Sequence, residues 1–70
     1  MEIGRIIKYY RELNNLTQLQ LAEKADINEK YYGRIERDES SPTINKVENI
    51  CKALDIEMID LFYGYKELNS

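Results

Sequence analysis

Residues 17–36 read TQLQLAEKADINEKYYGRIE, and the spacing within this stretch decides the fold. Thr17, followed three residues later by Gln20, is the capping-box pattern that starts a helix. Asp26 stands where that helix must stop, and Asn28 can cap a new helix only two residues later. Such a short joint forces a sharp angle between the two helices.

The two predicted helices, near Gln18 to Ala25 and Glu29 to Glu36, each have one apolar side. In the first, the buried side consists of Leu21, Ala22 and Ala25. In the second, an apolar stripe is formed by Tyr31, Tyr32 and Ile35. The opposite, polar and basic face carries Glu29, Lys30, Gly33, Arg34 and Arg37. Two short helices joined by a tight turn, the second with such a face, have the geometry that places a recognition helix in the major groove of DNA.

Apolar residues also recur three and four positions apart outside this stretch, which predicts three more helices. One helix, ending near Asn14, has an apolar face of Ile3, Ile6, Ile7, Tyr10 and Leu13. After a loop at 38–42, Thr43 can cap a helix whose apolar residues are Ile44, Val47, Ile50, Cys51 and Leu54. A last helix from about Glu57 carries Met58, Ile59, Leu61 and Phe62. No segment alternates with a period of two, so we expect one all-α domain of five helices over residues 1–70.

Length and composition favour a small binding domain over an enzyme. A chain of 70 residues buries only about 60% of its unfolded surface, which leaves hardly any room for an enclosed substrate cavity. Histidine is absent and Cys51 is the only cysteine, so we expect a core cysteine and no metal or cofactor. No apolar run approaches the roughly eighteen residues of a membrane span, and no signal-peptide core follows Met1, so we expect a cytoplasmic protein.

The distribution of charge allows a polyanionic partner despite the net charge of -3. Residues 1–37 contain seven Lys and Arg against six Asp and Glu, whereas residues 38–70 contain three against seven. A basic face in the first half can therefore still meet phosphates. The alternative for this face is an ordinary solvated charged surface.

Many residues between about Ile3 and Phe62 match one family pattern. The matching residues are Arg11, Glu12, Thr17, Gln18, Leu21, Ala22, Tyr31, Ile35, Glu36, Pro42, Ala53, Leu54, Leu61 and Phe62. On these residues the chain resembles the Xre and phage-repressor (Cro/C1-type) family of helix-turn-helix proteins. The resemblance implies a compact five-helix bundle of the lambda-repressor-like type. It also implies sequence-specific binding of double-stranded DNA by a transcription regulator, for which we expect repression rather than activation.

The resemblance also implies roles for individual residues. Contacts to bases would come from Glu29, Lys30, Gly33 and Arg34, whose chemistry suits guanine, cytosine or a closely approached thymine methyl. Contacts to phosphates are expected from Thr17, Gln18, Asn28 and Arg37, since free N–H groups at a helix start also favour an anion. A buried ion pair between Arg11 and Glu36 would tie the first helix to the end of the third. An ordinary solvated residue is the alternative for Gln18.

Several residues depart from the family pattern. Asp26, Asp38 and Asp55 stand where glycine usually follows a helix, so each should adopt a left-handed backbone with its charge poorly placed beside a helix C-terminus. Tyr32 replaces an aliphatic core residue, and its hydroxyl should therefore reach a polar neighbour or water. Leu19 replaces a polar residue and is either an exposed apolar spot or part of a contact.

The last helix and tail contain more apolar surface than one short helix needs for packing. We expect a homodimer on a palindromic operator, with the contact made by Met58, Ile59, Phe62, Tyr63, Tyr65 and Leu68. The alternative is that these residues only close the core. A protein-interaction module such as an antitoxin or antirepressor, whose acidic second half docks a basic partner, is the competing function.

Overall fold

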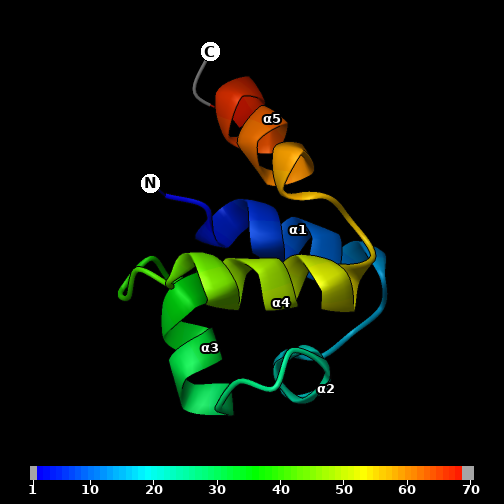
Figure 1. Ribbon diagram of the computed structural model, residues 1–70, viewed down its shortest axis with the longest axis vertical. Coiled ribbons are helices and arrows are strands. Elements are labelled where there is room, and N and C mark those ends of the chain that lie inside the picture. Colours follow the sequence, from blue (N-terminus) through cyan, green and yellow to red (C-terminus); the bar gives the residue numbers. More distant parts are fainter. Residues whose placement is uncertain (1, 69–70) are drawn as a thin grey trace.

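The computed structural model describes residues 2–68. These residues contain five α-helices and no strand (Figure 1). Their bounds are α1 Gly4–Leu13, α2 Gln18–Lys24, α3 Glu29–Glu36, α4 Ile44–Leu54 and α5 Met58–Leu68. The predicted all-α class and the predicted range of α3 are confirmed. The α2 helix ends one residue earlier than predicted, because Ala25 is its C-cap.

Side-chain caps fix the starts of α2, α3 and α4. The Thr17 hydroxyl oxygen accepts from the Gln20 N–H at 3.1 Å, and the Gln20 Oε1 accepts from the Thr17 N–H at 2.8 Å. Asn28 and Thr43 accept in the same way from the backbone N–H three residues further on. These bonds satisfy donors that a helix start otherwise leaves without partners.

Asp26, Asp38 and Asp55 adopt the predicted left-handed backbone, with φ of 57°, 58° and 58°. For Asp38, the predicted poor placement of its charge is wrong. Its Oδ1 accepts a hydrogen bond of 3.0 Å from the backbone N–H of Gly4, the first residue of α1. The carboxylate therefore lies at the N-terminus of a helix, where the helix dipole favours a negative charge.

The core collects apolar side chains from all five helices. Its largest fully buried side chains are Tyr32, Ile7, Leu21, Ile35 and Ile50. Cys51 is buried among them, as predicted, and burial raises the pKa of its thiol. Two expected core residues, Leu13 and Ile44, are instead 62% and 65% exposed. Both lie at the ends of helices, where the periodicity indicates a face but no neighbouring element covers it.

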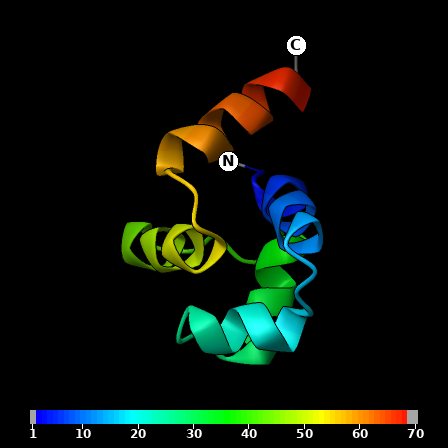
Figure 2. The ribbon, with the colours of Figure 1, turned by 90° about the vertical axis from the view of Figure 1, so that its right-hand side faces the viewer.

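The helices are arranged so that α2 and α3 lie at one end of the molecule and α5 at the other (Figures 1 and 2). Between them, α1 and α4 form the middle layer, against which α5 packs. Both views agree that α5 is remote from the α2–α3 pair. None of the described helices is both long and apolar enough to span a membrane.

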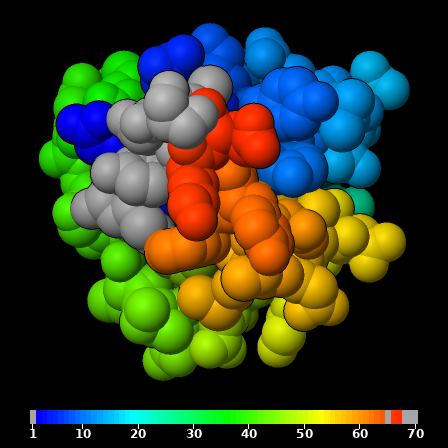
Figure 3. Space-filling model, turned by 90° about the horizontal axis from the view of Figure 1, so that it is seen from above, coloured from blue at the N-terminus to red at the C-terminus, as the bar shows by residue number. Residues whose placement is uncertain are grey.

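The outer surface of α5 carries several exposed apolar side chains, and Figure 3, which views the molecule from above, shows this helix (orange to red) facing the viewer. The exposed apolar side chains here are Met58, Ile59, Phe62 and Tyr63. A groove of about 320 Å³ between α4 and α5 is lined by apolar side chains, including Ile44 and Phe62. The side chains of Tyr65 and Leu68, also expected on this surface, lie outside the described part of the structure, as does the tail at 69–70.

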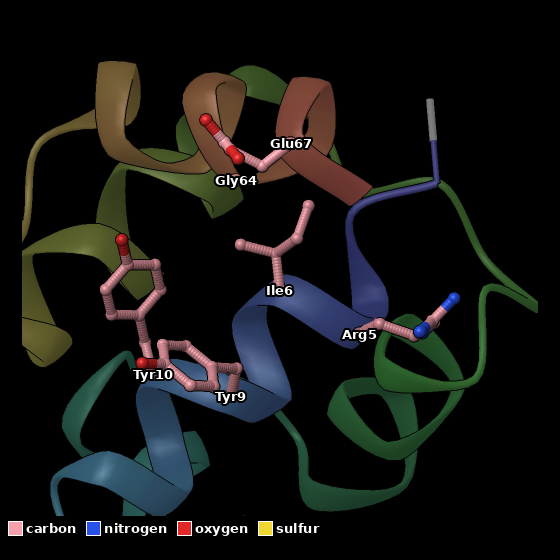
Figure 4. Close-up of a pocket in the computed structure, with 6 residues that line it drawn as sticks. All are labelled: Arg5, Ile6, Tyr9, Tyr10, Gly64 and Glu67. Carbon is pink, nitrogen blue, oxygen red and sulfur yellow. The ribbon is translucent and has the colours of Figure 1, made fainter. Parts of the chain in front are cut away.

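A second groove, of about 450 Å³, lies beside the contact between α1 and α5 (Figure 4). It is lined by Arg5, Ile6, Tyr9, Tyr10, Gly64 and Glu67. The two tyrosine rings meet edge to face, with centroids 5.4 Å apart. Gly64 allows the two helices to approach, because a Cβ there would lie 2.8 Å from Cγ2 of Ile6.

Candidate nucleic-acid interface

The turn between α2 and α3 fixes the angle of the helix-turn-helix. Asp26 reverses the chain in its left-handed conformation, and the Ile27 N–H donates to the Ala22 carbonyl at 2.8 Å. The Ile27 side chain is buried, and Asn28 then starts α3. The α2 helix thus packs across one side of α3 and leaves the other side facing outward.

Six of the predicted DNA-contacting residues line a single hollow of about 350 Å³ on the outward side of α3. They are Gln18, Glu29, Lys30, Gly33, Arg34 and Arg37. Three cations and one carboxylate surround the hollow, so its formal charge is positive although the whole chain has a net charge of -3. The remaining two predicted phosphate ligands, Thr17 and Asn28, cap α2 and α3.

Gly33 forms the floor of this hollow. The residue is buried, contrary to the exposed position expected from its face of the helix, because neighbouring side chains extend over it. A Cβ at this position would lie 3.2 Å from Nη1 of Arg37 and 3.6 Å from Oε1 of Gln18. The missing side chain therefore makes room for two of the protein's own polar groups.

Behind the hollow, the predicted ion pair between Arg11 and Glu36 is present and largely buried. Nε and Nη2 of Arg11 lie 2.5 Å and 3.2 Å from the two carboxylate oxygens, and the side chains are 11% and 3% exposed. Nη1 of Arg11 donates to the Leu16 carbonyl at 2.8 Å. The pair thus ties α1 to the end of α3 and to the loop that leads into α2.

Two further side chains donate to the same carboxylate. Nε2 of Gln18 lies 3.0 Å from Oε1 of Glu36, and the Tyr32 hydroxyl donates to Oε2. Tyr32 thereby meets the expectation that its buried hydroxyl finds a polar partner. Glu36 is thus an acceptor for three side chains from three helices, and we call Arg11, Gln18, Tyr32 and Glu36 the Glu36 hub.

The ionisation of the hub follows from these bonds. Burial acts to raise the pKa of Glu36, but hydrogen bonds from Arg11, Tyr32 and Gln18 outweigh it and hold that pKa below its ordinary value. The pKa of Arg11 is raised by its hydrogen bond to Glu36, and burial raises the pKa of the Tyr32 hydroxyl. At neutral pH the hub therefore contains one carboxylate, one guanidinium and two neutral donors.

Arg37 has a partner that the sequence analysis did not identify. Its Nε and Nη2 lie 3.0 Å and 3.2 Å from the two carboxylate oxygens of Glu39, and both side chains are about half exposed. The sequence signal for this pair is that the opposite charges stand only two residues apart. The pair lies at the surface, where such interactions contribute little to stability, so Arg37 can exchange Glu39 for another anion.

Gly4 is the other structurally important residue that sequence reasoning missed. A Cβ at Gly4 would lie 2.3 Å from the carbonyl oxygen of Glu36 and 2.6 Å from that of Ile35. The α1 helix therefore starts in direct contact with the backbone at the end of α3. No local pattern indicates this contact, because the two segments are more than thirty residues apart.

Comparison with known proteins agrees with this geometry. Residues 7–61 match the family described as Helix-turn-helix. The immunity repressor protein of Bacillus phage phi105 is 41% identical over 58 residues, which cover 83% of this chain and 40% of the repressor. The chain spans about half the length of most of the curated relatives it matches.

Solved structures share the same helical arrangement. The restriction-modification controller protein C.AhdI from Aeromonas hydrophila superposes with a TM-score of 0.85 at 28% identity, covering 87% of this chain and 92% of that one. SinR, a master regulator of biofilm formation solved in complex with DNA, superposes with a TM-score of 0.81 at 34% identity, covering 86% of this chain and 97% of that one. SinR relatives of this chain come from Bacillus subtilis and Bacillus licheniformis. The chain belongs to the helix-turn-helix family, of the Cro/C1 type that its residues resemble.

Proposed function

We propose that this protein binds double-stranded DNA sequence-specifically through the major groove and acts as a transcription repressor. The observation that carries the proposal is the positively charged hollow on the outward side of α3, which gathers six predicted DNA ligands in a helix-turn-helix. Relatives described as an immunity repressor and as transcriptional regulators support the regulatory role. This role requires no enzymatic activity, and it is consistent with a cytoplasmic location.

Within the hollow, we assign bases and phosphates by position along α3. Lys30 and Arg34 lie on the first part and the middle of the outward face, where a recognition helix comes closest to base edges. Arg34 can donate two hydrogen bonds to guanine O6 and N7. Arg37 follows the last residue of α3 and is assigned to a phosphate, for which it would exchange Glu39.

The assignment is tested with Arg34→Ala and Arg37→Ala on a duplex selected from a random pool and on a scrambled duplex, over a series of salt concentrations. For Arg34→Ala we expect a loss of about 1–3 kcal/mol on the selected duplex and a weaker preference at one base pair. For Arg37→Ala we expect equal losses on both duplexes and a salt slope smaller by about one unit per bound chain.

Lys52→Ala is the matched control, because Lys52 is an exposed cation of α4 outside the hollow. Its affinity and salt slope should remain those of the wild type. Equal losses of Arg34→Ala on both duplexes would show that Arg34 contacts only the backbone. Absent duplex binding by the wild type would reject DNA binding as the function, and salt-independent binding would reject the assigned phosphate contacts.

We further propose a homodimer that binds a palindromic operator through two half-sites about 34 Å apart. The exposed apolar side chains of α5 and the adjoining groove support this, since monomeric proteins rarely expose large contiguous apolar patches. Sedimentation at micromolar concentration, free and with operator duplex, should show a dimer, and a monomer in both states would refute it.

The same apolar surface supports the second candidate, a protein-interaction module. Its neighbourhood is acidic, because residues 38–70 contain seven Asp and Glu against three Lys and Arg. A module of this kind would bind a basic protein, and it would bind duplex DNA weakly or not at all. The duplex titration above therefore separates the two candidates.

A further inference from the structure

The Glu36 hub connects the predicted phosphate ligand Gln18 to Tyr32, a buried residue that does not line the hollow. Gln18 is the first residue of α2, and its Oε1 lies over the floor of the hollow, 3.6 Å from where a Cβ of Gly33 would be. Its Nε2 donates one hydrogen bond, of 3.0 Å, to Oε1 of Glu36. An amide nitrogen has two hydrogens, so the second one stays available for an anion at the start of α2.

The orientation of that second N–H depends on how firmly the Glu36 carboxylate is held. Arg11 donates to both carboxylate oxygens, and the Tyr32 hydroxyl donates to Oε2, the oxygen that Gln18 does not contact. Tyr32 is fully buried and precedes Glu36 by one helical turn, so its ring cannot move to another position without opening the core. Tyr32 adds a second donor on Oε2 to the one from Arg11, and together these bonds restrict rotation of the carboxylate, so that Oε1 presents a better fixed acceptor to the Gln18 amide.

We propose that the Tyr32 hydroxyl is a positioning group for DNA binding, acting through Glu36 to hold the Gln18 amide in the orientation that donates to a phosphate. The inference rests on the proposed function, because it assumes a phosphate at Gln18. Tyr32 itself stays buried and does not contact the DNA. Its hydroxyl lowers the entropy that Gln18 must lose on binding, which is how preorganised groups raise affinity.

The variant Tyr32→Phe removes only the hydroxyl and keeps the buried ring. We expect its affinity for the selected and the scrambled duplex to fall by the same factor, about threefold to tenfold, the range of one ordinary hydrogen bond. The salt slope should not change, because no charge is lost. Tyr10→Phe is the matched control, since it removes a hydroxyl from a half-buried tyrosine outside the hub, and it should bind as the wild type does.

A double-mutant cycle with Gln18→Ala separates positioning from a general loss of structure. If Tyr32 acts through Gln18, then Tyr32→Phe should change the affinity by less than about 1.5-fold once Gln18 is already alanine. Equal losses in both backgrounds would overturn the proposal while leaving DNA binding in place. An undiminished affinity of Gln18→Ala would overturn it as well.

A measurement without DNA tests the same link independently of the function. In ¹⁵N spectra of the free wild-type protein, the Gln18 side-chain amide should give two well-resolved signals with hydrogen exchange slower than that of the exposed Gln20 amide. In Tyr32→Phe the Gln18 amide should exchange faster, whereas in Tyr10→Phe it should not. Unchanged exchange in Tyr32→Phe refutes the positioning role, and loss of duplex binding by the wild type refutes the proposed function instead.

Discussion

The two ends of the molecule treat their side chains in opposite ways. At the α2–α3 end, polar groups are buried and satisfied: no described buried side-chain nitrogen or oxygen lacks a hydrogen-bond partner, and Glu36 alone accepts from three residues. At the α5 end, apolar side chains such as Ile59 and Phe62 remain more than half exposed. The buried polar groups of the first end are satisfied within one copy of the chain, whereas the second end exposes apolar surface to water, which is unfavourable.

Under the proposed function, this difference matches two different tasks, DNA binding at the α2–α3 end and self-association at the α5 end. A surface that must present hydrogen-bond donors to DNA needs fixed directions, which buried polar networks supply at the cost of desolvation. A surface that associates by apolar contact needs area rather than direction. Substitutions at the first end should therefore affect folding strongly, and those at the second should affect association.

The largest effect should come from Glu36→Ala. Removing this carboxylate leaves the buried Arg11 guanidinium without its counter-charge, which commonly costs about 3–5 kcal/mol of stability. Urea unfolding followed by circular dichroism at pH 7 measures the loss. The control is Glu39→Gln, which breaks the exposed pair with Arg37 and should leave the unfolding midpoint nearly unchanged. Similar losses for the two variants would contradict the contrast between buried and exposed pairs.

A smaller loss is expected for Gly4→Ala. The added Cβ would meet backbone carbonyl oxygens of α3, which cannot turn aside, so we expect a loss of about 1–3 kcal/mol. At the other end, Gly64→Ala meets only the side chain of Ile6, and alanine also favours a helix by about 0.5–1 kcal/mol. In thermal unfolding, the melting temperature of Gly4→Ala should therefore be well below that of Gly64→Ala. The reverse order would show that the α1–α3 contact is loose.

The pH dependence of stability sharpens the role of the hub. Because the folded pKa of Glu36 is depressed, its contribution is present above the unfolded value of about 4.3 and is lost as the pH falls through the lower folded value. As the pH decreases below about 4.5, the urea midpoint of the wild type should therefore decrease more steeply than that of Glu36→Gln. Parallel pH profiles for the two proteins would show that Glu36 is not stabilised as a carboxylate.

The smallest effect on folding should come from Ile59→Ser. Ile59 is 54% exposed, and surface substitutions usually change stability by less than about 0.5 kcal/mol. Self-association should nevertheless weaken by about tenfold or more, because burial of an isoleucine contributes more than 1.4 kcal/mol. Sedimentation over a concentration series measures this, with Tyr9→Ser on α1 as an equally exposed control. If Ile59→Ser associates as the wild type does, the dimer contact lies elsewhere.

The sequence by itself determined the features that depend on neighbours within one helical turn. The capping box at Thr17 and the caps at Asn28 and Thr43 predicted where three helices start, because each is made by a side chain and a backbone N–H three residues apart. The left-handed Asp residues followed from the positions that end helices. The family resemblance added the Arg11–Glu36 pair, which no local rule supplies.

Only the tertiary structure decided which groups from distant segments meet. Helical periodicity placed Leu13 and Ile44 on apolar faces, but packing left both exposed because no helix covers those ends. The contact of Gly4 with the α3 backbone and the bond from Gln18 to Glu36 join residues separated by many turns. Such contacts depend on the positions of whole helices, which result from filling one common core, and a pattern within one segment carries no information about its partner across that core.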